Sequence, residues 1–187
     1  MVQRCPWPAE DPLMIEYHDH EWGVPVYDDT KHFEFMVLDL FQAGLSWRTV
    51  LYKREHFREA FDNFDVEKIT AYNDLKVQGL LDNKNIIRNR LKIMAVIHNA
   101  DRFIEIQKQY GSFNEYIWQF AGGKPIINTW KQLKELPTST KESDKMSQDL
   151  MKKGFKFVGS TICYAYMQAA GLVNDHLVSC YRYKELI

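Results

Sequence analysis

Cysteine and histidine residues stand in two pairs at opposite ends of the chain. Cys5 and His18 have twelve residues between them, and His176 and Cys180 stand at i and i+4, which stacks both side chains on one face of a helix. Thiolates and imidazoles are common zinc ligands, and four protein ligands leave no open position for water. The two pairs predict a structural zinc ion that ties the chain ends together, although such spacings also occur by chance.

The run His-Asp-His-Glu from His18 to Glu21 offers a rival, catalytic metal site. Consecutive residues point in different directions and seldom bind one ion together, so we favour the structural site. The chain has three cysteines, an odd number that fits metal ligands or reduced thiols better than a set of disulfides.

A second group of residues could bind a flat, cationic ligand. The first quarter of the chain holds four aromatic residues around one carboxylate on a predicted helix; they are Trp7, Tyr17, Trp22, Trp47 and Asp39. Aromatic faces attract positive charge, and a carboxylate accepts hydrogen bonds. An alkylated purine has these properties. Any single aromatic residue is more often part of the core, so the prediction depends on their occurring together with Asp39.

The charge is divided unevenly along the chain. The formal net charge is −1, which by itself argues against a protein coated in positive charge for nucleic acid. Residues 1–40, however, hold nine acids and two bases, whereas residues 41–187 hold sixteen acids and twenty-two bases. The near-neutral sum therefore conceals an acidic segment and a basic remainder.

Part of the basic excess follows a predicted tight turn at 82–85. No acid interrupts the stretch between Asp82 and Asp101, and four bases stand at its start: Lys84, Arg88, Arg90 and Lys92. A turn between two helices exposes backbone N–H groups that bind phosphate together with such side chains. The alternative is an ordinary solvated helix surface.

Length and periodicity predict one all-α domain over residues 1–187, long enough to bury a core. Hydrophobic residues make up 45%, yet no apolar run is long enough for a membrane span, and no leader precedes the acidic N-terminal segment. We therefore expect a cytoplasmic protein with no membrane partner. The expected helices are 28–44, 46–61, a short one from 65, 73–81, 86–110, 112–120, 143–153 and 159–170, with 126–137 irregular and no strand pair.

Six sequence blocks, in order, together resemble the DNA-3-methyladenine glycosylase I family. The blocks are 11–13, 17–25, 42–47, 137–140, 154–159 and 171–176. The resemblance implies the helix-hairpin-helix DNA glycosylase superfamily, with residues 82–92 as the hairpin. It also implies hydrolysis of the N-glycosidic bond of 3-methyladenine in double-stranded DNA, which releases the free base.

The resemblance also assigns roles to residues. The zinc ligands would be Cys5, His18, His176 and Cys180, tying segments 1–27 and 172–187 to the helical body. Tyr17 and Trp47 match aromatic residues of the base pocket, beside Trp7 and Trp22, and Gly44 and Leu45 match a loop that approaches the gap left by the flipped nucleotide. Lys84, Arg88 and Arg90 would bind the DNA backbone, and we expect a monomer.

Two residues depart from the family pattern in the pocket. Asp39 stands where the family has glutamate, and Met14 stands where a tyrosine is common. Asp39, the candidate catalytic residue, is one methylene shorter, which changes its reach to the base. A retuned glycosylase is the leading hypothesis. The alternative is a zinc-stabilised protein that binds DNA or alkylated bases with weak or altered glycosylase activity.

Overall fold

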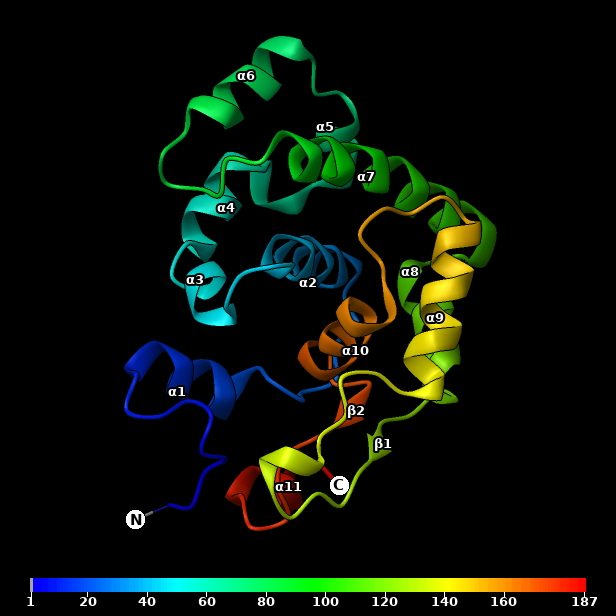
Figure 1. Cartoon of the computed structure of the whole chain (residues 1–187). Helices are drawn as coiled ribbons and strands as arrows, with labels where there is room; N and C mark the ends of the chain where they lie inside the picture. The colour runs from blue at the N-terminus through cyan, green and yellow to red at the C-terminus, as the bar shows by residue number, and fades with distance from the viewer. Residues whose placement is uncertain (1) are drawn as a thin grey trace.

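The computed structural model describes residues 2–187 and confirms a mainly helical chain. Eleven α-helices run through this part of the chain (Figure 1): α1 (Pro12–His20), α2 (Asp29–Gln42), α3 (Trp47–Leu51), α4 (Arg54–Ala60), α5 (Val66–Thr70), α6 (Asp74–Asp82), α7 (Arg90–Tyr110), α8 (Phe113–Trp118), α9 (Lys141–Lys152), α10 (Ser160–Ala169) and α11 (Tyr181–Glu185). Short 3₁₀ turns occur at Asp62–Phe64, Gln119–Ala121 and Leu133–Glu135. Among the described helices, none is long and apolar enough to cross a membrane.

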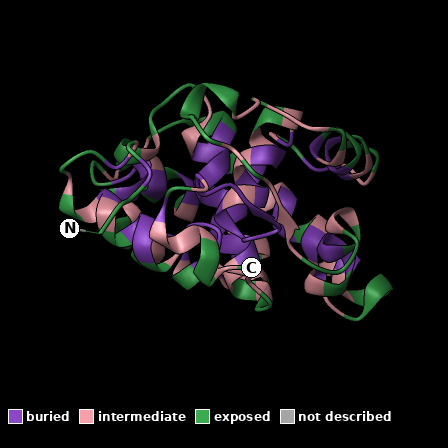
Figure 2. Cartoon of the chain, turned by 90° about the horizontal axis from the view of Figure 1, so that it is seen from below, coloured by how far each residue is buried: buried purple, intermediate pink, exposed green. Residues whose placement is uncertain are grey.

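Helix α2 is the centre of the fold. Every residue from His32 to Phe41 is buried, because α2 packs against α3, α7, α8 and α10 on different sides. Figure 1 shows α2 with α7 on one side and α10 on the other, and Figure 2 shows buried residues gathered in the interior helices. A helix that is apolar nearly all round belongs in a core. The polar Asp39 on this helix is therefore an exception that calls for a reason.

The expectation of no strand pair was wrong. Strands β1 (Ile126–Ile127) and β2 (Val173–Asn174) pair in parallel, with Ile126 opposite Val173 and Ile127 opposite Asn174. Two residues are too few to produce the alternating pattern that marks a strand in a sequence. The pair joins the irregular stretch after the 3₁₀ turn at Gln119–Ala121 to the segment after α10.

Several boundaries also differ from those expected. The helix expected at 46–61 is two helices, α3 and α4, because the backbone leaves helical geometry at Lys53. Helix α7 begins at Arg90 rather than at 86, where the side chain of Asn89 caps it by accepting from the N–H of Lys92. Helix α9 begins at Lys141 after the cap Thr140. Helix α1, which the periodicity did not predict, is capped by Asp11.

The segment that follows α1 approaches the backbone at Gly171, just after α10. Its φ is +69°, and a Cβ there would lie 2.3 Å from the carbonyl carbon of Val24 and 2.4 Å from the nitrogen of Pro25. Only glycine fits such close backbone approach with a left-handed φ. The N–H of Val26 also donates to the carbonyl of Ala170 at 3.0 Å. The segments after α1 and after α10 therefore lie side by side.

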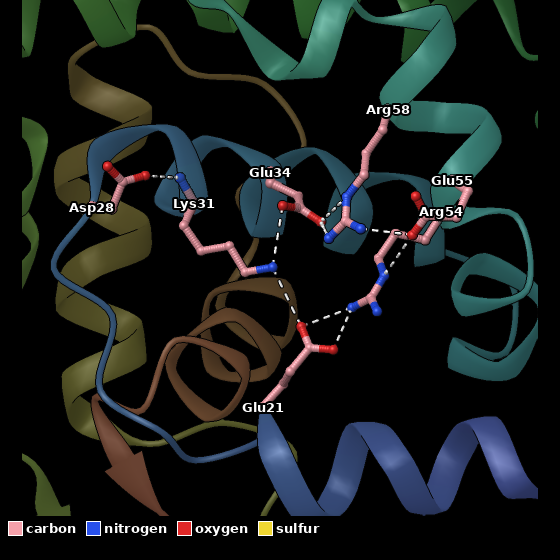
Figure 3. Close-up of polar contacts among 7 residues, drawn as sticks. All are labelled: Glu21, Asp28, Lys31, Glu34, Arg54, Glu55 and Arg58. Carbon is pink, nitrogen blue, oxygen red and sulfur yellow. Dashed lines mark hydrogen bonds and ion pairs between the residues drawn. The ribbon is translucent and has the colours of Figure 1, made fainter.

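A half-buried group of charges fixes α1 against the central helices (Figure 3). Glu21, at the end of α1, pairs with Arg54 of α4 at 2.7 Å and with Lys31 of α2 at 3.3 Å. Glu34 of α2 joins the group through Lys31 at 3.2 Å and Arg58 at 2.6 Å. Burial alone would raise the pKa of Glu21, but its ion pairs with Arg54 and Lys31 lower it overall. This network holds the helix that carries Met14 and Tyr17 against the helix that carries Asp39.

Candidate functional site

A cavity of about 280 Å³ lies between α1, α2, α10 and the start of α3. The six residues predicted for substrate binding all line it, and they are Trp7, Met14, Tyr17, Trp22, Asp39 and Trp47. Five residues that were not predicted for substrate binding line it as well, and they are Gln42, Leu133, Leu136, Ala165 and Gln168. Two glutamines of this second set had a signal in the sequence: Gln42 stands in the block 42–47 of the family resemblance, and Gln168 is a polar residue near the end of the apolar helix α10.

Aromatic rings form the walls of this cavity. The rings of Tyr17 and Trp47 have centroids 4.9 Å apart, and Trp7 lies edge to face with Trp22 at 5.1 Å. Trp22 in turn lies edge to face with His176 at 4.7 Å. The cysteine and histidine cluster therefore supports one wall of the cavity from behind.

The carboxyl group of Asp39 is buried without a partner. The residue is 3% exposed, its carboxyl makes no hydrogen bond with any residue of 2–187, and its Oδ2 is fully enclosed. Burial raises the pKa of Asp39 well above its usual value, because nothing nearby compensates the charged form. A buried polar group without a partner is rare in a folded protein and calls for a functional reason.

Two further enclosed side-chain atoms without partners belong to residues that line the same cavity. Of the five such side-chain atoms within residues 2–187, three are Asp39 Oδ2, Trp7 Nε1 and Trp47 Nε1. Burial and the neighbouring Asp39 also raise the pKa of Tyr17 well above its usual value, so its hydroxyl keeps its proton. The cavity thus combines aromatic faces with an acidic group, which suits a polar, aromatic ligand.

The four predicted metal ligands converge. Cys5, His18, His176 and Cys180 are buried, and one ligand atom from each lies within 4.8 Å of all the others. The Sγ of Cys180 is 3.5 Å from His18 Nε2 and 3.6 Å from His176 Nδ1, and the Sγ of Cys5 is 3.7 Å from His176 Nδ1. A zinc tetrahedron with bonds of about 2.0–2.3 Å has edges of about 3.5 Å, so the four donors fit this ion.

The outer nitrogens of both imidazoles are already held. His18 Nδ1 lies 2.8 Å from Asp19 Oδ1, and His176 Nε2 lies 2.9 Å from the carbonyl oxygen of Trp22. Burial by itself raises the pKa of Asp19, but hydrogen bonds from Arg4 and His18 lower it to about 2. These acceptors orient the other nitrogen of each ring toward the centre of the cluster.

The chain forms the cluster differently from the expectation. His176 and Cys180 do not share a helical face, because α11 begins only at Tyr181 and the two residues belong to the turn before it. The rival site at 18–21 does not form: His20 is exposed beside Glu16, and Glu21 pairs with Arg54.

The basic residues after the turn separate into two kinds. Lys84, Arg88 and Arg90 are exposed and take part in no ion pair within residues 2–187. Lys92 is buried, and its Nζ donates to the carbonyl oxygens of Phe41 at 2.9 Å and Ala43 at 2.6 Å. Its ammonium caps the end of α2, and so holds the start of the loop that contains Gly44 and the 44% exposed Leu45.

Lys92→Met should lower the free energy of unfolding by about 2 kcal/mol, because two carbonyls at the end of α2 lose their buried donor. Urea denaturation measures the change. Lys84→Met is the control, since Lys84 is exposed and its side chain donates no hydrogen bond to a carbonyl within residues 2–187. Equal stability of the two variants would contradict the capping role.

Solved structures of 3-methyladenine DNA glycosylase I match this fold. A crystal structure of 3-methyladenine DNA glycosylase I matches with a TM-score of 0.93 at 50% identity, covering 96% of this chain and 98% of that chain. The structure of the Staphylococcus aureus 3-methyladenine DNA glycosylase I, determined for its recognition of 3-methyladenine, matches with a TM-score of 0.92 at 34% identity, covering 95% of each chain.

Sequence comparison identifies the family. The model of the methyladenine glycosylase family matches residues 7–183. DNA-3-methyladenine glycosylase 1 of Escherichia coli (strain K12) is 48% identical over 179 residues, which cover 96% of each chain. The DNA-3-methyladenine glycosylase of Haemophilus influenzae is 46% identical, over 96% of this chain and 97% of that protein. The chain belongs to the methyladenine glycosylase family.

Proposed function

We propose that this protein excises 3-methyladenine from double-stranded DNA by hydrolysing the N-glycosidic bond. The observation that carries the proposal is the aromatic cavity around the unpartnered carboxyl of Asp39. Relatives at 48% and 46% identity carry the name of this activity, and a related glycosylase has been solved in complex with 3-methyladenine.

The cavity suits the charge of the damaged base. Adenine alkylated at N3 is cationic, so the rings of Trp7, Tyr17 and Trp47 offer it faces of negative potential. A cation beside Asp39 favours the carboxylate form of this group. The cost of burying that charge is therefore offset only when the cationic base is bound. The site therefore discriminates against uncharged, undamaged bases.

The chemistry needs little acid catalysis. A cationic base is already a good leaving group, so the protein does not have to protonate it. As the bond breaks, positive charge develops on the sugar, and the ionised Asp39 stabilises this charge from its fixed, buried position on α2. Asp39 acts here as an electrostatic stabiliser.

The DNA would be held outside the cavity. We place α6, the turn and the start of α7 as the helix-hairpin-helix that binds backbone phosphates through Lys84, Arg88 and Arg90. The exposed Leu45 would enter the gap left when the damaged nucleotide turns into the cavity. This arrangement needs one chain of a single domain, so we propose a monomer.

We assign a structural zinc ion to Cys5, His18, His176 and Cys180. Four protein ligands close its coordination, so it contributes folding energy rather than chemistry. The cluster ties segments 1–27 and 172–187 together behind Trp22, a wall residue of the cavity.

Arg88→Gln/Arg90→Gln should weaken binding to duplex DNA and reduce the slope of log affinity against log salt by about 2, because each phosphate contact contributes about 0.9. Fluorescence anisotropy over a range of salt concentrations measures this slope. The matched control is Lys108→Gln/Lys124→Gln, which removes two exposed charges distant from the turn. An equal change in both double variants would contradict the assigned DNA surface.

The test of the proposed function compares the protein with Asp39→Glu on methylated duplex DNA, with released bases identified by chromatography. We expect free 3-methyladenine from the unmodified protein and a faster release from the glutamate variant, whose longer side chain matches the family. If neither releases the base while both bind the DNA, the protein has the alternative function of binding DNA or alkylated bases.

A further inference from the structure

The buried carboxylate of Asp175 accepts four hydrogen bonds. Its Oδ1 accepts from Asn128 Nδ2 at 2.7 Å and Trp130 Nε1 at 2.8 Å. Its Oδ2 accepts from the hydroxyl of Tyr164 at 2.5 Å and from Gln168 Nε2 at 2.8 Å. A carboxylate offers about four acceptor positions, so these donors use all of them.

This arrangement fixes the orientation of the Gln168 amide. Because Asp175 only accepts, the amide must direct its NH₂ group toward Asp175 and its oxygen the other way. That oxygen accepts no hydrogen bond from residues 2–187 and is not among their enclosed atoms without partners. Since Gln168 lines the cavity with Asp39, its free oxygen is available to a molecule bound there.

We infer that Gln168 recognises the exocyclic amino group of the bound adenine, and that Asp175 is the positioning residue that keeps the Gln168 oxygen toward the cavity. This inference rests on the proposed function. The amino group at position 6 of adenine is a donor, whereas guanine has an acceptor oxygen at the same position. A fixed amide oxygen accepts a hydrogen bond from the amino group of adenine. With guanine, the same oxygen would face another acceptor, and no hydrogen bond could form.

Without Asp175, the amide could turn over and present its NH₂ group to a guanine lesion. Asp175→Asn produces this change in a defined way. The indole of Trp130 can only donate, so the oxygen of the new asparagine stays toward Trp130 and its NH₂ group faces Gln168. Gln168 then turns its oxygen toward residue 175 and its NH₂ group toward the cavity.

The experiment measures single-turnover release of 3-methyladenine and 3-methylguanine from the same methylated duplex DNA. Gln168→Leu should slow release of 3-methyladenine by about tenfold with little change for 3-methylguanine, because only the amino group loses its acceptor. Asp175→Asn should lower the ratio of the 3-methyladenine rate to the 3-methylguanine rate by about tenfold or more.

Trp130→Phe is the matched control. It removes a donor from Oδ1 of the same carboxylate while Gln168 keeps its bond to Oδ2, so the ratio should stay unchanged even if stability falls. Metal content and circular dichroism of Asp175→Asn are compared with those of the unmodified protein. This check is needed because residue 175 is next to His176, one of the four residues assigned to the zinc ion. If Asp175→Asn does not fold, Gln168→Leu alone decides.

Two results would overturn the inference: an unchanged ratio in Gln168→Leu, or an equal loss for both lesions in a folded Asp175→Asn. If the unmodified protein releases neither base, the proposed function fails instead. In that case, the affinities of the free 3-methyladenine and 3-methylguanine bases, measured by quenching of tryptophan fluorescence in the same variants, still decide whether Gln168 discriminates between them.

Discussion

Asp39→Asn is expected to slow the release of 3-methyladenine by about 10²–10³-fold, because the variant cannot place a negative charge beside the cationic base and the developing sugar cation. Asparagine has nearly the same shape, so the cavity keeps its walls. Single-turnover release from methylated duplex DNA measures the loss, and affinity for undamaged DNA should not change. Release at the original rate would remove Asp39 from the mechanism.

The free energy of unfolding of Asp39→Asn should exceed that of the unmodified protein by an amount that grows as the pH rises. The pKa of Asp39 is raised in the folded protein, whereas an aspartate in the unfolded chain has a pKa of about 4. Above that pH, unfolding releases a proton that the folded protein keeps, so the unmodified protein loses stability until the folded pKa is passed. Asparagine does not titrate and avoids this loss.

Urea denaturation between about pH 5 and 8 measures the difference, which should grow with pH in favour of Asp39→Asn. Asp101→Asn makes the same chemical change at an exposed position of α7 and should show no such trend. Removal of the Asp39 carboxyl is thus expected to slow the reaction but to stabilise the folded protein. A group with this combination of effects is retained for function. A difference that stays constant with pH would contradict the buried, neutral state of Asp39.

Cys180→Ser is expected to lower the free energy of unfolding by at least about 3 kcal/mol and to reduce bound zinc from one ion per chain to well below one. The loss follows because the cluster joins two segments from opposite ends of the chain. Excision per folded molecule should change far less than stability. Elemental analysis and urea denaturation, with and without a chelator, measure both quantities.

Cys163→Ser is the matched control for this prediction. Cys163 is also buried, and burial raises its pKa to about 12, but it lies outside the cluster and donates to the carbonyl of Val158. Its variant should keep the zinc and lose about 1 kcal/mol. The zinc assignment fails if the purified protein holds no metal and if Cys5 and Cys180 are both freely alkylated in the folded state.

The sequence predicts the parts of this site that depend on residue type and order. The aromatic residues and Asp39 all stand between residues 7 and 47, and helices α1, α2 and α3 of this part of the chain bring them to one cavity. The cysteines and histidines at the ends are few and chemically specific, so their convergence could be expected even though the local conformation of His176 and Cys180 could not.

What the sequence could not predict depends on tertiary contacts. Lys92 stands among exposed bases but is buried, because the end of α2 lies where its ammonium can reach the carbonyls. Asp175 meets Asn128 and Trp130 from the segment following β1, a contact that no local pattern indicates. The parallel pairing of β1 and β2 has the same cause, since its two short partners are far apart in the chain.

The most direct test of the account is a time course of 3-methyladenine release from an excess of methylated duplex DNA. We expect each protein molecule to release more than one base, and Asp39→Asn to lose nearly all of this release. Release no faster than in DNA without protein, from a folded protein that still binds the DNA, would contradict it.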